Sequence, residues 1–278
     1  MNLARVKAVK SLKSVVERSS QKPLSAEFDG KSAFNGEALS LVGLNLQAVI
    51  NLKNLSPETV NQLSFNTDKL SHYSQLVLIG HAGKQLWQKL KQWQALRNLS
   101  EKLSDPVDDF SKYHVQKYFN QRFKENDFEL IYPLTKATQS NSSINLQTLG
   151  QIAGWHHQSP FGVGINQQWG SWFAYRAVVL LKSNYQPAKS PHSHFHSQSP
   201  CQSCENKPCI QSCPAGALDS AQLNLKACLS YRVQKDSRCQ DRCIARMACP
   251  VAERHQYPLE QIQYHYSRSM QVIKKIGQ

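Results

Sequence analysis

The sequence contains no long apolar run, since no stretch approaches the roughly 20 consecutive apolar residues that a membrane helix needs. Its first ten residues, MNLARVKAVK, also lack the apolar core of a secretory signal peptide. No cysteine precedes Cys201, so most of the chain holds no candidate for a disulfide bond. These absences argue against a membrane-spanning protein and against a secreted protein held together by disulfides. We expect a cytoplasmic protein without a membrane span.

Acidic residues are also scarce in this chain of 278 residues. The chain has 19 Asp and Glu but 33 Lys and Arg, which gives a formal net charge of +14. Such a field favours acidic partners, namely nucleic acid, an anionic membrane surface, a phosphorylated cofactor or an acidic redox protein. Hydrophobic residues make up 40% of the chain and charged residues 19%, which excludes wholesale disorder and fibrous classes. The basic segment up to Lys22 is either a solvated helix or a transit peptide.

Residue patterns predict an α+β domain over residues 1–182, in which strand and helix signals alternate. The predicted elements are strands at 75–80 and 128–133 and helices at 84–97, 105–123 and 146–155. Residues 161–181 predict two strands that are joined through 166–168 and form a central hairpin. The helix that begins near Asp105 has a capping carboxylate and a proline at its first position.

The remainder of the chain divides into three parts. Residues 183–200 are rich in proline, serine and histidine without periodicity, which is typical of a linker. Three alternating histidines there belong either to a polar linker or to an adventitious metal site: His192, His194 and His196. Residues 201–257 hold every cysteine of the chain. Residues 258–278 form the last part, in which 259–276 predict a helix with one apolar stripe that we expect to pack back on the first domain.

The eight cysteines form one unit with two Cys-Pro endings. They are Cys201, Cys204, Cys209, Cys213, Cys228, Cys239, Cys243 and Cys249. In two-cluster ferredoxins, three closely spaced cysteines hold one 4Fe-4S cluster, while a fourth cysteine before a proline reaches the other cluster. By this rule, a first cluster is held by Cys201, Cys204, Cys209 and Cys249. A second cluster is held by Cys213, Cys228, Cys239 and Cys243, so that eight ligands fill two clusters.

Two alternatives compete with this interpretation. Two zinc sites usually need paired C-x2-C knuckles, and only Cys201 and Cys204 have that spacing. The other alternative is a protein with one 4Fe-4S cluster, in which the later cysteines bind no metal. The doubled Cys-Pro ending and the small residues after Pro214 favour iron-sulfur chemistry over zinc.

Three further stretches are similar to one superfamily, the CblC-type cobalamin-processing proteins and the epoxyqueuosine reductases, which are related to reductive dehalogenases. The stretch DPVDDFSKYH at 105–114 resembles the start of a helix in the CblC-type proteins, and GSWFAYRAVVLL at 170–181 resembles one of their strands. Near the end of the chain, four residues match the family spacing YxxEQxxY: Tyr257, Glu260, Gln261 and Tyr264. The cysteine unit instead resembles that of the epoxyqueuosine reductases, whose RCISY-like segment corresponds to ACLSY at 227–231.

This resemblance, which covers roughly residues 75–264, implies a flavin-reductase-like (nitroreductase-like) α+β domain and a small ferredoxin-like domain with two clusters. The first domain would bind a cobalamin, or alternatively a flavin, beside the strand at 170–181. The candidate cofactor-binding residues are Trp169, Trp172, Tyr175 and Arg176. The aromatic side chains either stack on a planar cofactor or belong to the core, and Arg176 pairs either with an anionic ligand or with a buried carboxylate. His114 is either a proton donor or a core histidine, and no residue is identified as catalytic.

The sequence departs from the family at two places, and these departures limit which family properties can be expected of this chain. Asn166 and Gln167 stand where the family often has His-Pro, so this loop offers no imidazole to a cobalt ion. The C-terminal repeat domain that epoxyqueuosine reductases associate with tRNA has no counterpart in the 29 residues after Cys249, which argues against a tRNA substrate despite the basic charge.

The sequence therefore predicts an iron-sulfur reductase that passes electrons from two 4Fe-4S clusters to a bound cobalamin or flavin. The alternative is an electron-transfer protein or cobalamin chaperone without turnover of its own. The expected partners are an electron donor such as a ferredoxin or flavodoxin and a corrinoid or small-molecule substrate.

Overall fold

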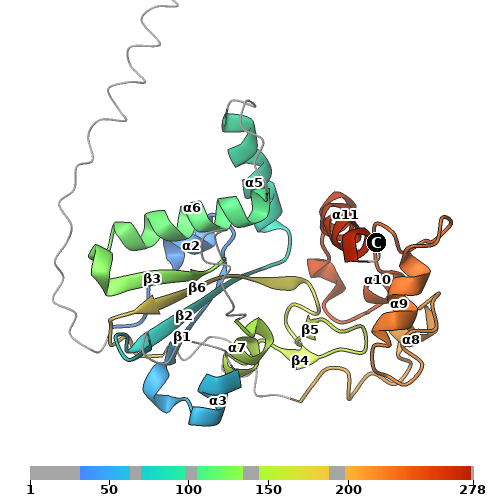
Figure 1. The fold of residues 1–278 in the computed structure, drawn as a ribbon, viewed down its shortest axis with the longest axis horizontal. Helices are drawn as coiled ribbons and strands as arrows, with labels where there is room; N and C mark the ends of the chain where they lie inside the picture. Colours follow the sequence, from blue (N-terminus) through green and yellow to red (C-terminus); the bar gives the residue numbers. More distant parts are fainter. Residues whose placement is uncertain (1–31, 63–69, 98–104, 134–143, 188–197, 277–278) are drawn as a thin grey trace, which may run out of the picture.

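The structure is a computed structural model, and it describes residues 32–62, 70–97, 105–133, 144–187 and 198–276. The basic segment up to Lys22 and the three histidines of the predicted linker lie outside these ranges. A four-stranded antiparallel sheet forms the centre of the first part of the chain, in the order β1, β2, β6, β3 (Figure 1). These strands are Leu46–Asn51, Gln75–Ala82, Phe173–Leu181 and Phe128–Tyr132. The protein therefore has a mixed α+β fold.

Helices cover both faces of this sheet, as Figure 1 shows. One face packs against α2 (Glu37–Leu41), α5 (Gln85–Leu96) and α6 (Pro106–Asn120) through a cluster centred on Phe110, Phe119 and Val179. The other face packs against α7 (Leu146–Ile152) and Trp155, with α3 (Pro57–Gln62) on the same side. Because both faces are covered, all eight residues of β2 are buried, which explains the apolar run at 76–79.

Local capping determines where α6 begins, as predicted. The Asp105 carboxylate accepts a hydrogen bond from the backbone N–H of Asp108 at 3.5 Å, and Pro106 occupies the first turn. Asp108 and Asp109 lie at the positive end of the helix dipole. The helix ends at Asn120, three residues before the predicted end. Asp105 thus has the structural role of a cap.

The predicted central hairpin at 161–181 is wrong. Its first strand, β5 (Gly164–Ile165), pairs with β4 (His157–Gln158), while β6 pairs with β2 and β3. The Asn166 side chain separates the two strands, because it accepts a hydrogen bond from Trp169 N and donates one to Trp155 O. This buried amide fixes a turn that sends the apolar strand β6 between two other strands, where both of its edges are paired.

The cysteine-bearing part consists of short helices and turns, and it lies beside β4 and β5 (Figure 1). Its helices are α8 (Pro208–Gln211), α9 (Leu225–Arg232), α10 (Ile244–Met247) and the 3-10 turn η5 (Glu253–His255). The last helix, α11, has the predicted bounds of Leu259–Ile276. Two further 3-10 turns, η1 (Leu52–Asn54) and η2 (Glu125–Asp127), precede α3 and β3. Among the described residues, no helix has the length and apolarity to cross a membrane.

Candidate metal centre

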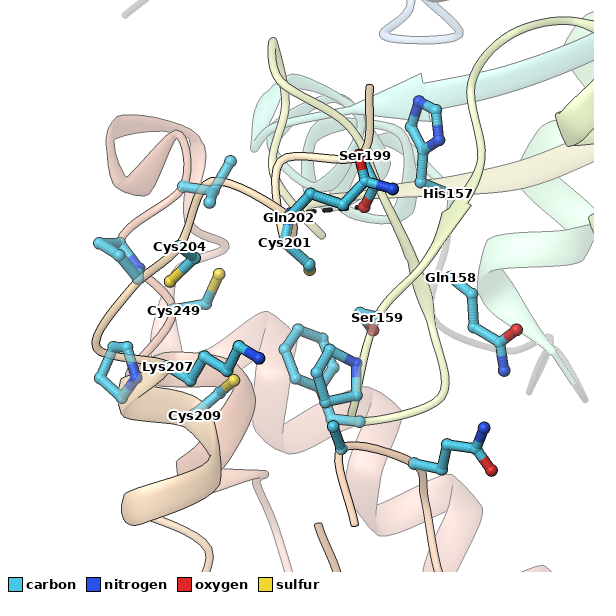
Figure 2. A pocket seen from close by; sticks show the side chains of 17 residues that line it. His157, Gln158, Ser159, Ser199, Cys201, Gln202, Cys204, Lys207, Cys209 and Cys249 are labelled. Carbon is cyan, nitrogen blue, oxygen red and sulfur yellow. Dashed lines mark hydrogen bonds between the residues drawn. The ribbon is translucent and has the colours of Figure 1, made fainter. Parts of the chain in front are cut away.

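Three cysteines that are close in sequence and a fourth that is 40 residues further on line one cavity of about 510 Å³. Figure 2 shows the sulfur atoms of Cys201, Cys204, Cys209 and Cys249 gathered around this space. We call these residues the first cysteine group. The opposite wall belongs to the sheet part of the chain and includes His157, Gln158, Ser159, Pro160 and Phe161. The first cysteine group therefore faces a space that both parts of the chain enclose.

The packing of α8 against α10 brings the first cysteine group together. Cys209 lies in α8, and Cys249 follows α10 directly before Pro250. Burial raises the pKa of the Cys209 thiol, and the neighbouring Cys249 sulfur raises it further. Thiols with raised pKa values bind metals only after they lose their protons, so a positively charged centre is needed to hold them as thiolates.

The other four cysteines form a second cysteine group: Cys213, Cys228, Cys239 and Cys243. Burial raises the pKa of the Cys228 thiol, and the nearby sulfurs of Cys243, Cys213 and Cys239 add to this rise. Cys243 also caps α10, because its sulfur accepts a hydrogen bond from Arg246 N at 3.4 Å. Cys228 thus lies near the other three cysteines of its predicted set, and the assignment of the eight cysteines to two clusters stays a prediction.

These two groups fit the ligand chemistry of 4Fe-4S clusters. Within the described part of the chain, no three His, Cys, Asp or Glu side chains are arranged to hold a single metal ion. A cubane cluster is larger than one ion and takes four thiolates, each on a separate iron. Four cysteine sulfurs around one shared cavity, as in the first cysteine group, match this requirement.

Arg246 joins the second cysteine group to the sheet part of the chain. Its guanidinium donates hydrogen bonds to the side-chain and backbone oxygens of Ser171, at 3.2 and 2.5 Å. It also lies 4.5 Å from the ring centroid of Trp172 and 5.5 Å from that of Tyr257. Because Cys243 is the N-cap of α10, this contact fixes the second cysteine group against the loop before β6.

A buried polar network lies on the face of the sheet that α6 and α11 cover. Arg176 Nε donates to His81 Nδ1 at 3.0 Å, so the His81 proton resides on Nε2, which lies 3.0 Å from the Tyr257 hydroxyl. Arg176 also pairs with Asp108 at 3.7 Å. Burial, with Arg176, His265 and Arg246 nearby, holds the pKa of His81 well below its usual value of 6.5.

The four predicted cofactor-binding residues do not meet in one place. Trp172 is buried against Tyr257, and Trp169 packs on His255 with ring centroids 4.3 Å apart. Tyr175 lies on the other face of the sheet from Arg176, where its hydroxyl contacts His156 Nδ1 at 2.9 Å. A role for these residues at a cofactor stays a prediction.

His114 packs on Phe110 with ring centroids 4.4 Å apart. Burial, followed by the charge of Lys117, lowers its pKa to about 4. Both observations agree with a neutral histidine against the core, which was the alternative to a proton donor.

Sequence reasoning missed two features of this region. The segment 157–161 lines the cavity of the first cysteine group, and its only signal is a pair of histidines after α7. His81 is a polar residue that follows the apolar run at 76–79 in the buried strand β2, which is a recognisable signal of a buried network. Neither signal reveals a partner that is distant in sequence.

Comparison with known proteins finds no matching family model. The chain is 31% identical to the mouse (Mus musculus) cyanocobalamin reductase / alkylcobalamin dealkylase, in an alignment of 107 residues that covers 32% of this chain and 38% of that protein. The structure is similar to epoxyqueuosine reductase from Bacillus subtilis, with a TM-score of 0.47 and 13% identity, over 80% of this chain and 65% of that one. An epoxyqueuosine reductase solved with a tRNA stem loop gives a TM-score of 0.46 and 14% identity, over 81% of this chain and 66% of that one. The chain thus spans less than two thirds of the length of the first relatives that it matches.

Proposed function

We propose that this chain is an iron-sulfur reductase in which two 4Fe-4S clusters pass electrons to a corrinoid bound beside the first cysteine group. The observation that carries this proposal is the shared cavity, because four cysteines and residues 157–161 enclose the same space. With the first cluster between the four sulfurs, an acceptor on the wall formed by residues 157–161 would lie directly beside that cluster. The similarity to a cobalamin reductase favours a corrinoid over a flavin as this acceptor.

The residues around the cavity suit a ligand with a large apolar body and many amide groups. Pro160 and Phe161 supply an apolar wall, and Gln158, Gln202 and Gln222 supply amide donors and acceptors. Lys207 places a positive charge beside Cys209, as Figure 2 shows. This charge favours electron uptake by an adjacent cluster, since it stabilises the more negative, reduced form.

Each group of residues has its own task in this proposal. The first and second cysteine groups hold the clusters, which supply one-electron chemistry when bound. Arg246 keeps the second cysteine group next to the sheet part of the chain. A ferredoxin or flavodoxin would supply electrons to the second cluster.

A second candidate function is electron transfer or cobalamin delivery without turnover. It is favoured by the cavity lining, in which the described residues include no Asp or Glu to serve as a proton donor. His157 is the titratable side chain on the wall opposite the cysteines.

Stopped-flow spectroscopy tests these candidates. The anaerobic protein is reduced with dithionite, freed of excess reductant and mixed with cyanocobalamin, while the cluster and corrinoid bands are followed together. A reductase shows cluster oxidation and corrinoid reduction at the same rate, with release of cyanide over several turnovers when donor is supplied. A delivery protein binds the corrinoid without repeated release. Unchanged spectra of both partners would contradict the proposal, and parallel mixing with FMN or with a tRNA stem loop identifies a different acceptor or ligand.

A further inference from the structure

A second hollow in the surface lies beside the second cysteine group. It has a volume of about 480 Å³, and we call its lining residues the arginine hollow: Ser237, Arg238, Asp241, Arg242, Ile244 and Met247. Arg238 precedes Cys239 in the chain, and Arg242 and Ile244 flank Cys243. Among the described residues, the arginine hollow shares none with the cavity of the first cysteine group. Each cysteine group therefore has a hollow of its own.

Helix α10 connects the two spaces. Cys243 is its N-cap, and Ile244 and Met247 line the arginine hollow. Cys249, which follows the last residue of α10 by two positions, lines the first cavity. The helix is a single turn of four residues, which is about 6 Å long. A path for electrons from the arginine hollow to the cavity at residues 157–161 therefore crosses one short helix.

The rim of the arginine hollow is basic. Arg238 and the nearby Lys235 are exposed, and neither forms an ion pair with another described residue. Arg242 instead pairs with Asp241, whose carboxylate oxygens lie 2.7 Å from its Nε and 2.9 Å from its Nη2. The charge of Asp241 is thus balanced within the hollow, and the charge of Arg238 remains in excess. Because residues 226–246 contain six Lys and Arg against two Asp, this part of the chain attracts an acidic partner.

The hollow combines this charge with apolar surface. Four thiolates give a 4Fe-4S cluster a net negative charge, which by itself repels an acidic partner. Arg238 and Arg242 bring charge of the opposite sign to the surface beside the cluster ligands. Ile244 and Met247 are half-buried and add apolar contact area, and a methionine side chain adapts its shape to a partner. An apolar centre with a polar rim is the usual composition of a protein–protein interface.

We propose that the arginine hollow is the docking surface of a small acidic electron-carrier protein that reduces the cluster of the second cysteine group. In each encounter, one electron leaves the carrier, which is oxidised, and enters the 4Fe-4S cluster, which is reduced, while no bond forms or breaks. The inference deepens the proposed function and rests on the clusters assigned there. Electrons then enter the protein at the arginine hollow and leave it at the cavity of the first cysteine group.

An acidic protein suits the arginine hollow better than a nucleic acid does. Asp241 lies in its wall, and Ile244 and Met247 contribute apolar surface. The phosphate backbone of a nucleic acid instead needs a stripe of positive charges along its length. Electron-transfer complexes are typically weak, with interfaces below about 1,200 Å², so one hollow with a charged rim is enough for such a partner.

Binding of flavodoxin tests this surface, because flavodoxin is an acidic carrier whose FMN bands are separable from those of the clusters. The full chain is purified anaerobically with both clusters, and its dissociation constant for flavodoxin is measured by calorimetry at low and at high salt. Stopped-flow mixing with flavodoxin hydroquinone then gives the second-order rate of cluster reduction. We expect Arg238→Glu to raise the dissociation constant and to lower this rate by about tenfold at low salt, since it replaces an attractive charge with a repulsive one. The difference from the wild type should shrink at high salt.

Lys124→Glu is the matched control, because it changes the net charge of the chain by the same amount. Lys124 is exposed in the connection between α6 and β3, which lies on the opposite side of the structure from α10 (Figure 1). This variant should leave the dissociation constant and the rate unchanged. Equal effects of Lys124→Glu and Arg238→Glu would show attraction by the overall charge and would overturn the proposal. Binding of an RNA stem loop that is lost in Arg238→Glu would overturn it as well.

Iron and sulfide analysis of each protein separates loss of a cluster from loss of docking. Where Arg238→Glu contains less iron than the wild type, Arg238→Gln is the second test, since it removes the charge without reversing it and should weaken binding by a smaller factor. Wild-type protein without iron and sulfide overturns the proposed function. Wild-type protein with two clusters that dithionite reduces, but that bind neither flavodoxin nor an acidic ferredoxin, overturns only the docking surface.

Discussion

Replacement of Arg176 by methionine removes the guanidinium from the buried network and keeps the apolar stem of the side chain. The change leaves His81 Nδ1 without its donor, and His81 is fully buried. A buried acceptor without a partner costs about 1 to 3 kcal/mol. The pair with Asp108 adds at most about 1 kcal/mol, because its atoms are 3.7 Å apart and 37% of the Asp108 side chain is exposed. We expect the free energy of unfolding to fall by about 3 kcal/mol.

Urea denaturation of the anaerobic protein, followed by tryptophan fluorescence, measures this loss. Arg268→Met is the matched control, since Arg268 pairs with Asp105 at 3.2 Å with side chains that are 41% and 45% exposed. Such an exposed pair contributes less than about 1 kcal/mol. The reasoning is refuted if Arg176→Met costs no more than Arg268→Met at equal denaturant slopes. A stable Arg176→Met protein that binds cobalamin weakly would instead support the predicted cofactor role of Arg176.

Three further predictions concern other residues. Cys249→Ser should eliminate the cluster of the first cysteine group, and loss of the second cluster in electron paramagnetic resonance would show that the crossed ligation is wrong. Burial, with the charges of Arg176 and Arg246, lowers the pKa of His265 to about 3. A histidine whose pKa falls on folding stabilises the protein above its unfolded pKa of 6.5 and loses this effect as the pH falls, so stability should drop by about 2 kcal/mol between pH 7.5 and 5. In His265→Phe the free energy of unfolding should depend less on pH. Equal pH dependence in the variant and the wild type would contradict this prediction. Gln261 is fully buried, and neither of its amide atoms has a partner among the described residues, so Gln261→Leu should raise the free energy of unfolding by about 1 kcal/mol. If chemical denaturation gives Gln261→Leu a lower free energy of unfolding than the wild type, the amide binds a ligand or a water molecule.

The elements that the sequence predicts well are those with local signals. The cap at Asp105 and the proline after it determine the start of α6 within a few residues. The apolar stripe of α11 repeats over a whole helix, and its bounds are confirmed. The assignment of the cysteines to two clusters also uses a local signal, the proline after Cys213 and Cys249, and it stays a prediction.

Features that depend on distant partners were not predictable in the same way. The turn at Asn166 and the burial of both sheet faces determine that β6 pairs with β2 and β3. The alternation of apolar and polar residues in the sequence reveals neither of these causes. Arg176 has a partner in His81, which is 95 residues away. Strand β1 and helix α2 precede residue 75, where the sequence resemblance begins.

Iron and acid-labile sulfide in the anaerobically purified full chain test the central claim most directly. The claim is that eight cysteines hold two 4Fe-4S clusters, one of them beside the cavity that residues 157–161 share. The account predicts about eight iron and about eight sulfide per chain, as the stoichiometry of two cubanes requires. Stoichiometric zinc without sulfide would contradict it.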